Sequence, residues 1–140
     1  MKKMRRKAKQ LISVQDVEDI AVGGAVLGTG GGGDPYVGKL MAQRAIEEFG
    51  PPEMMALNDV PDDKYVMLSA GIGAPTVLIE KILRGDEAVT VFKALQRHLG
   101  KKAFAVMSAE VGGVNGTIPI AVAARLKFDV MFVVFFLSVF

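Results

Sequence analysis

The spacing of apolar residues along the chain predicts helices that alternate with strands. Ser13, with Asp16 three residues later, forms a capping-box pattern, and the apolar positions from Val17 to Leu27 then recur at the period of a helix with one buried face. Further helices are expected at 36–49, 76–83, 87–99 and 120–126. Strands are expected at 54–57 and 102–110. A third strand is expected to begin at residue 64 and to run into a glycine loop that ends at residue 75.

Strands that alternate with helices of this length are typical of an α/β fold. We therefore predict a layered α/β sandwich with a largely parallel sheet, helices on both faces and glycine-rich loops at strand ends. In such sheets, ligands bind where the strands end. The second and third glycine loops, residues 71–75 and 112–119, are expected there.

The first glycine loop places five glycines in the six positions from Gly28 to Gly33. It fits the G-x-G-x-x-G dinucleotide pattern, but that fingerprint requires a preceding strand, and the residues before Gly28 have helical spacing. Two interpretations stay open. The loop could hold an anion at a helix N-terminus, or the glycines could allow two backbones to pack closely.

Composition narrows the function classes. The chain has no cysteine and a single histidine, His98, which excludes thiolate chemistry, multi-histidine metal sites and most histidine-based triads.

The positive charge of the chain is concentrated at its N-terminus. Six of the first ten residues are basic, and the other 130 residues contain 11 basic and 15 acidic ones, so the net charge of +2 comes from the N-terminal segment. That segment is either a weak anchor for anionic surfaces or a solvated terminus; we expect no nucleic-acid or membrane partner. No export signal is read, so a cytoplasmic location is expected.

Three longer strings carry a family resemblance: "DVEDIAVGGAVLGTGGGGDPYVGKLMA", "SAGIGAPTVLIEK" and "SAEVGGVNGTIPIAVAA". Together they resemble the amino-terminal domain of the S-methyl thiohydantoin desulfurase family, over about residues 13–124. The resemblance implies an α/β domain joined to a β-rich second domain, in proteins associated with hydantoin metabolism.

The resemblance ends near residue 126. The family continues into an acidic segment and a second domain, whereas this chain continues as "KFDVMFVVFFLSVF" and stops. We expect residues 1–12 to be a basic flexible tail, 13–128 an α/β domain, and 129–140 an apolar strand or a tail left by truncation. Truncation is favoured, because an uncovered apolar strand is prone to aggregate.

Glu110 is the strongest catalytic candidate. It follows a predicted strand and precedes two glycines and Asn115, so it could act as a general acid or base while Asn115 orients a ring amide. Glu110 could equally brace the loop, and Asp34 could simply cap the helix that opens at Pro35. The residues expected to bind substrate are Gly30, Gly31, Gly32, Gly33, Asp34, Gly71, Gly73, Gly112 and Gly113.

Other polar residues have simpler interpretations. Glu80 and Lys81 are expected to form an exposed pair, and His98 to stabilise the end of a helix dipole.

Two functional classes follow from these residues and the resemblance. The first is a hydrolase-like enzyme domain for a small cyclic amide or thioamide of hydantoin type, impaired in this short form. The second is a noncatalytic binding or accessory subunit, and a nucleotide-binding domain comes third. The expected partners are a small-molecule ligand and the family's second domain, with a homo-oligomer as a further option. No metal site is expected, and the cofactor is left open.

Overall fold

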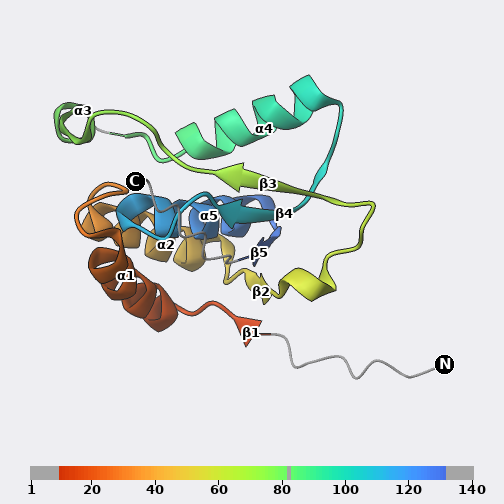
Figure 1. Cartoon of the computed structure of the whole chain (residues 1–140), viewed down its shortest axis with the longest axis horizontal. Helices are drawn as coiled ribbons and strands as arrows, with labels where there is room; N and C mark the ends of the chain where they lie inside the picture. Colours follow the sequence, from red (N-terminus) through yellow and green to blue (C-terminus); the bar gives the residue numbers. More distant parts are fainter. Residues whose placement is uncertain (1–9, 82, 132–140) are drawn as a thin grey trace, which may run out of the picture.

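The computed structural model describes residues 10–81 and 83–131 (Figure 1). In chain order the elements are β1 (Gln10–Leu11), α1 (Val14–Gly28), α2 (Pro35–Phe49), β2 (Glu53–Met55), the 3-10 turn η1 (Leu57–Asp59), β3 (Tyr65–Ser69), α3 (Pro75–Glu80), α4 (Glu87–Leu99), β4 (Ala103–Ser108), α5 (Gly113–Leu126) and β5 (Asp129–Met131).

The five strands form one sheet in the order β1-β2-β5-β4-β3. β1 is antiparallel to β2, and the other neighbours are parallel. Met67, Val106, Val130 and Met54 occupy the same register position across four strands, so their side chains share one face. The α/β class and the largely parallel sheet predicted from the sequence are confirmed.

Helix α5 is the centre of the layered structure. Its residues from Gly113 to Ala124 are all buried, because it packs against β3, β4 and β5 on one side and against α2 on the other. Helix α1 lies against both α2 and α5 (Figure 1). The layers are therefore the sheet, then α5, then the α1–α2 pair.

Helix α4 shares the sheet face on which α5 lies. Phe92 of α4 belongs to the same hydrophobic cluster as Met67, Val106 and Ile118, and its ring centroid is 5.8 Å from that of Phe128. Helices are predicted from the sequence on both faces of the sheet, but α4 and α5 lie on the same face. Helix α4 connects β3 to β4, and α5 connects β4 to β5, so both connections cross the sheet in the same direction. Because such connections are right-handed, both helices lie on the same side of the sheet.

Three helices show which boundaries the sequence pattern predicted and which one it missed. The Ser13–Asp16 capping box is present, with the Ser13 N–H donating to Asp16 Oδ2 at 2.7 Å, and α4 has the predicted bounds. The third glycine loop, predicted to run from Gly112 to Pro119, is wrong in extent. Helix α5 already begins at Gly113, after Gly112 at the N-cap, and Pro119 lies inside it.

The segments predicted to be terminal contribute strands to the sheet. β1 comes from the predicted basic tail, and β5, from the predicted C-terminal segment, lies between β2 and β4 with Val130 fully buried. The remainder of both predicted tails, residues 1–9 and 132–140, lies outside the described residues. Among the described helices, none has the length and apolar character needed to cross a membrane.

Candidate functional site

The three glycine segments meet at the carboxyl edge of the sheet. The loop after α1 packs on the loop between β4 and α5: a Cβ added to Gly28 would lie 2.8 Å from the Gly112 Cα. The loop after β3 joins them through Asn115, whose side chain bonds Gly71.

Most glycines at this junction are needed for close packing of backbones. A Cβ on Gly32 would collide with the Gly112 carbonyl, and one on Gly113 would collide with the Gly33 carbonyl. Gly32 and Gly113 also have φ angles of +76° and +46°, which side chains rarely adopt. By contrast, nothing lies within 4 Å of a Cβ built on Gly30 or Gly73. We call Gly28, Gly32, Gly112 and Gly113 the glycine joint.

At the N-termini of α5 and α2, where an anion would bind, protein oxygens already accept hydrogen bonds from the backbone N–H groups. The Gly32 carbonyl accepts a hydrogen bond from the Asn115 N–H at 3.1 Å, so a protein oxygen already lies at the N-terminus of α5. At the N-terminus of α2, Asp34 Oδ1 accepts from the Tyr36 N–H at 2.8 Å. The segment before Gly28 is helix α1, so the strand that the dinucleotide fingerprint requires is not there.

Asn115 connects two of the loops with all of its side-chain groups. Its Oδ1 accepts from the Gly71 N–H at 2.7 Å, while its Nδ2 donates to the Gly71 carbonyl at 3.0 Å and to Glu110 Oε1 at 2.8 Å. The residue is buried, with 7% of its surface exposed. These bonds use both amide protons, so Asn115 positions the Gly71 loop and the Glu110 carboxylate.

Ser108, which the sequence analysis did not single out, lies beneath the same loop. Its hydroxyl lies 2.9 Å from the Asn115 carbonyl, contacts the Glu110 carbonyl and accepts from the Glu110 N–H at 3.2 Å. Pro119 has no N–H to donate to Asn115 four residues before it, and the Ser108 hydroxyl can bond that carbonyl instead. This explains why the helix tolerates Pro119. In the sequence, this arrangement could have been found only from a serine at the end of a predicted strand, 11 residues before a proline.

Glu110 is half-buried at this edge, in the loop between β4 and α5. Asn115 holds its Oε1, and no described side chain bonds its second carboxylate oxygen. The substrate-binding roles of the glycines and of Asp34 stay predictions. The structure shows that the glycine joint packs backbone against backbone, that Gly30 and Gly73 have open space around them, and that Asp34 caps α2.

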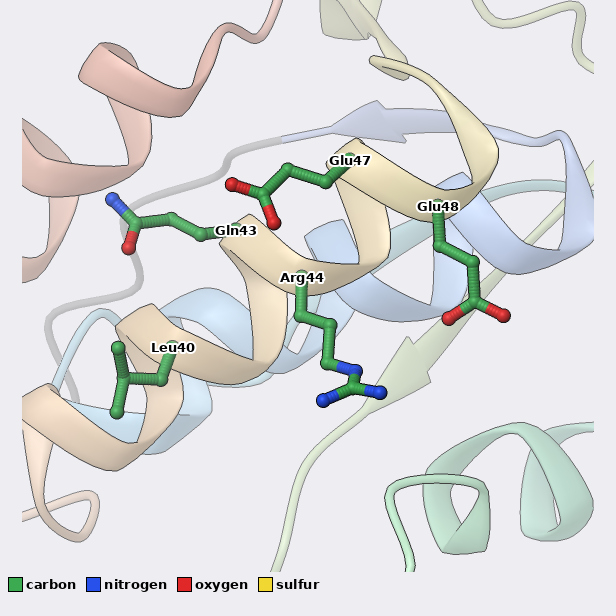
Figure 2. Close-up of a pocket in the computed structure, with 5 residues that line it drawn as sticks. All are labelled: Leu40, Gln43, Arg44, Glu47 and Glu48. Atoms are coloured by element: carbon green, nitrogen blue, oxygen red, sulfur yellow. The ribbon is translucent and has the colours of Figure 1, made fainter.

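Two hollows of the described surface lie away from this edge. One, of about 640 Å³, follows the outer side of α2, where Leu40, Gln43, Arg44, Glu47 and Glu48 extend from a single helix (Figure 2). The other, of about 220 Å³, lies near the opposite end of α5 and is lined in part by Pro52, Lys127 and Phe128. Neither hollow touches Glu110 or the glycine joint.

The remaining polar candidates are exposed. Glu80 and Lys81 lie on the surface at the end of α3, and His98 is in the last turn of α4, where a cation would stabilise the helix dipole. Within the described residues, no three His, Asp or Glu side chains gather in a way that could hold a metal ion.

These observations define an α/β domain whose glycine-rich segments assemble a carboxylate-bearing edge. A family model described as "S-Me-THD-like, N-terminal domain" matches residues 15–131, most of the chain, and the chain belongs to this family. Neither the curated proteins nor the solved structures gave a match.

Proposed function

We propose that this domain carries the acid–base carboxylate of a hydrolase-like enzyme that acts on a small cyclic amide or thioamide of hydantoin type. The observation that supports this most is the arrangement of Glu110. It lies at the carboxyl edge of a parallel sheet, where α/β proteins bind ligands, and one of its oxygens is fixed by a buried asparagine. The choice of a hydantoin-type ligand is supported by the family's description, which refers to S-Me-THD.

Glu110 would act as a general base in this proposal. Its carboxylate would take a proton from a water molecule as the water oxygen adds to a ring carbonyl or thiocarbonyl carbon, or in S-methyl thiohydantoin to the carbon that carries the S-methyl group. The protonated acid would then return the proton to the departing group, which is the ring nitrogen when the ring opens and methanethiolate when the S-methyl group leaves. Asn115 contributes by fixing the orientation of the carboxylate, because its amide protons are already used by Glu110 and Gly71.

A working site at this edge of the sheet would need a cover. Acid–base chemistry on an amide benefits from exclusion of bulk water, and such pockets commonly close between domains. Because the matching family model is an N-terminal domain, we propose that a second domain of the family closes this edge. Without such a cover, this domain is expected to bind ligand weakly and turn it over slowly.

The test compares matched variants with hydantoin and S-methyl thiohydantoin as substrates, in a form of the protein that carries a second domain of this family. Glu110→Gln should lower turnover by about 100-fold or more while unfolding as the parent does. Glu47→Gln, on the exposed side of α2, is the control and should keep the parent rate. Parent rates in Glu110→Gln would contradict the proposal.

The accessory-subunit alternative is favoured by one observation. The bond from Asn115 to Glu110 makes this carboxylate a brace of the loop, whether or not it reacts. In that case Glu110→Gln would leave any turnover unchanged, whereas Glu110→Ala, which removes the oxygen that accepts from Asn115 Nδ2, would let the loop open more often. Faster hydrogen exchange of the Gly71 amide with unchanged chemistry would support this alternative.

A further inference from the structure

Two serines end neighbouring strands of the sheet, and their surroundings differ. Ser69 is the last residue of β3, Ser108 is the last residue of β4, and the two are partners in the register of this parallel pair. The Ser108 hydroxyl contacts the backbone of Glu110 and of Asn115. Ser69 is also buried, with 8% of its surface exposed, but its hydroxyl has no hydrogen-bond partner among the described residues. A buried hydroxyl without a partner costs free energy, so packing alone does not explain Ser69.

Both serines lie on the side of the sheet that α5 covers. Side chains alternate along a strand, so Ser69 shares a face with Met67, and Ser108 shares a face with Val106. Met67 and Val106 belong to the hydrophobic core between the sheet and its helices. The Ser69 hydroxyl is therefore on the α5 side, one strand away from the Ser108 hydroxyl, at a strand spacing of about 5 Å.

The Glu110 carboxylate lies at the same end of these two strands. Asn115 Nδ2 donates to the Gly71 carbonyl and to Glu110 Oε1. Gly71 lies two residues after Ser69 in the chain. On the neighbouring strand, Glu110 lies two residues after Ser108. Among the described residues, this edge therefore carries one unpartnered donor, the Ser69 hydroxyl, and one unpartnered acceptor, the second carboxylate oxygen of Glu110.

We propose that the Ser69 hydroxyl binds a ring carbonyl oxygen of the ligand; for the class of ligand, this inference rests on the proposed function. A hydantoin ring presents carbonyl oxygens as acceptors, and a serine hydroxyl is a donor whose proton rotates to suit its partner. The hydroxyl then donates to the carbonyl oxygen, while the second oxygen of Glu110 is left for the attacking water. When water adds to the same carbonyl carbon, this donor also stabilises the negative charge that develops on the oxygen.

A small ring can reach the Ser69 hydroxyl. Its oxygen is not one of the fully enclosed polar atoms of the described residues. Residues 70–74, which follow Ser69, are exposed, and nothing lies within 4 Å of a Cβ built on Gly73. The approach to the hydroxyl is therefore from the side of this loop.

The first test measures hydantoin binding to the 140-residue chain by NMR titration, which needs no turnover. Ser69→Ala should bind hydantoin about 5-fold more weakly, because one hydrogen bond is lost. It should unfold at the urea midpoint of the parent or above, because no bond within the protein is lost. Thr90→Ala, which removes a hydroxyl from an exposed residue of α4, is the control and should bind as the parent does.

Three results of this test would overturn the proposal. They are parent affinity in Ser69→Ala, a parent that binds no hydantoin up to the solubility limit of the ligand, and a lowered urea midpoint in Ser69→Ala. The last of these would make Ser69 a structural residue.

A second test uses the absence of cysteine from the chain. Ser69→Cys places a single thiol at the proposed contact, and hydantoin well above its Kd should slow alkylation by iodoacetamide by about 5-fold or more. Leu68→Cys is the matched control, because Leu68 is the neighbouring residue, is 53% exposed and lies on the other face of the sheet. Its alkylation should be unaffected by hydantoin. No slowing in Ser69→Cys, or equal slowing in both variants, would contradict the proposal.

The Ser69 contact and the acid–base role of Glu110 fail in different ways. Parent turnover in Glu110→Gln would remove the acid–base role and leave the contact between Ser69 and the ring carbonyl in place. Unchanged hydantoin affinity in Ser69→Ala would remove that contact and leave the acid–base role in place.

Discussion

Gly23 and Gly28 lie five residues apart in the same helix, α1, and their surroundings differ. Nothing lies within 4 Å of a Cβ built on Gly23, whereas one on Gly28 would lie 2.8 Å from the backbone of Gly112. The first glycine weakens its helix without any contact that explains it; the second lets α1 touch the loop that carries Glu110. Glycine enrichment in this chain therefore has more than one cause, and only part of it serves the site.

The same contrast separates Gly32 from Gly30. Both have positive φ, +76° and +94°, but only Gly32 faces a backbone carbonyl, that of Gly112. Gly32→Ala should be the most damaging of the changes considered, costing about 3 kcal/mol or more, because strain at φ adds to a clash. Gly30→Ala carries the strain alone and should cost about 1–2 kcal/mol. Urea unfolding measures both; equal losses would show that the glycine joint is not tightly packed.

A buried and an exposed side-chain amide, those of Asn115 and Gln43, also differ in the hydrogen bonds that they form. Asn115→Ala should cost about 2–3 kcal/mol, since it removes three bonds and leaves the Gly71 N–H and carbonyl unpaired. Gln43→Ala, which removes one exposed bond to the Val14 carbonyl, is the control and should cost less than about 0.5 kcal/mol. The Gly71 amide should exchange faster only in the Asn115 variant, and unchanged exchange would contradict the bridging role of Asn115.

The smallest expected effect concerns the start of α1, away from the glycine joint. Hydrogen bonds from the Ser13 hydroxyl and then from the Ser13 N–H hold the pKa of Asp16 below its usual 3.8. A lowered pKa in the folded state contributes stability above the unfolded value, and this is lost as the pH falls below about 4. Asp16→Ala should therefore lose less Tm than the parent between about pH 5 and pH 3. Glu47→Ala, which removes a carboxylate with no hydrogen-bond partner among the described residues, should follow the parent.

The sequence predicted those parts of the fold that depend on residues close together in the chain. The capping box and the bounds of α4 depend on neighbours in sequence, so the apolar period and the cap residues were sufficient. The start of α5 was missed because Gly113 and Pro119 argue locally against a helix. What compensates is the Ser108 hydroxyl on β4, which lies within bonding distance of the Asn115 carbonyl.

The candidate site was predictable in place but not in detail. The order of strands indicated that the loops carrying Gly71 and Glu110 would both lie where strands of the sheet end. The sequence could not show that the Asn115 side-chain amide bonds to Gly71, a residue 44 positions away. Nor could it show that the Gly32 carbonyl accepts a hydrogen bond at the N-terminus of α5. Both facts depend on contacts between distant segments, which periodicity does not record.

The central claim is that the glycine joint exists to let backbones touch, and one pair of substitutions tests it most directly. Gly23→Ala and Gly28→Ala make the same chemical change in the same helix, and urea unfolding gives the free energy of each. Gly23→Ala should stabilise the protein by about 0.5–1 kcal/mol, because alanine favours helix and the space is open. Gly28→Ala should destabilise it by about 1–3 kcal/mol, because the added methyl meets the Gly112 backbone, which cannot yield as a side chain would. Opposite signs are the predicted result, and a stabilising or neutral Gly28→Ala would contradict the account.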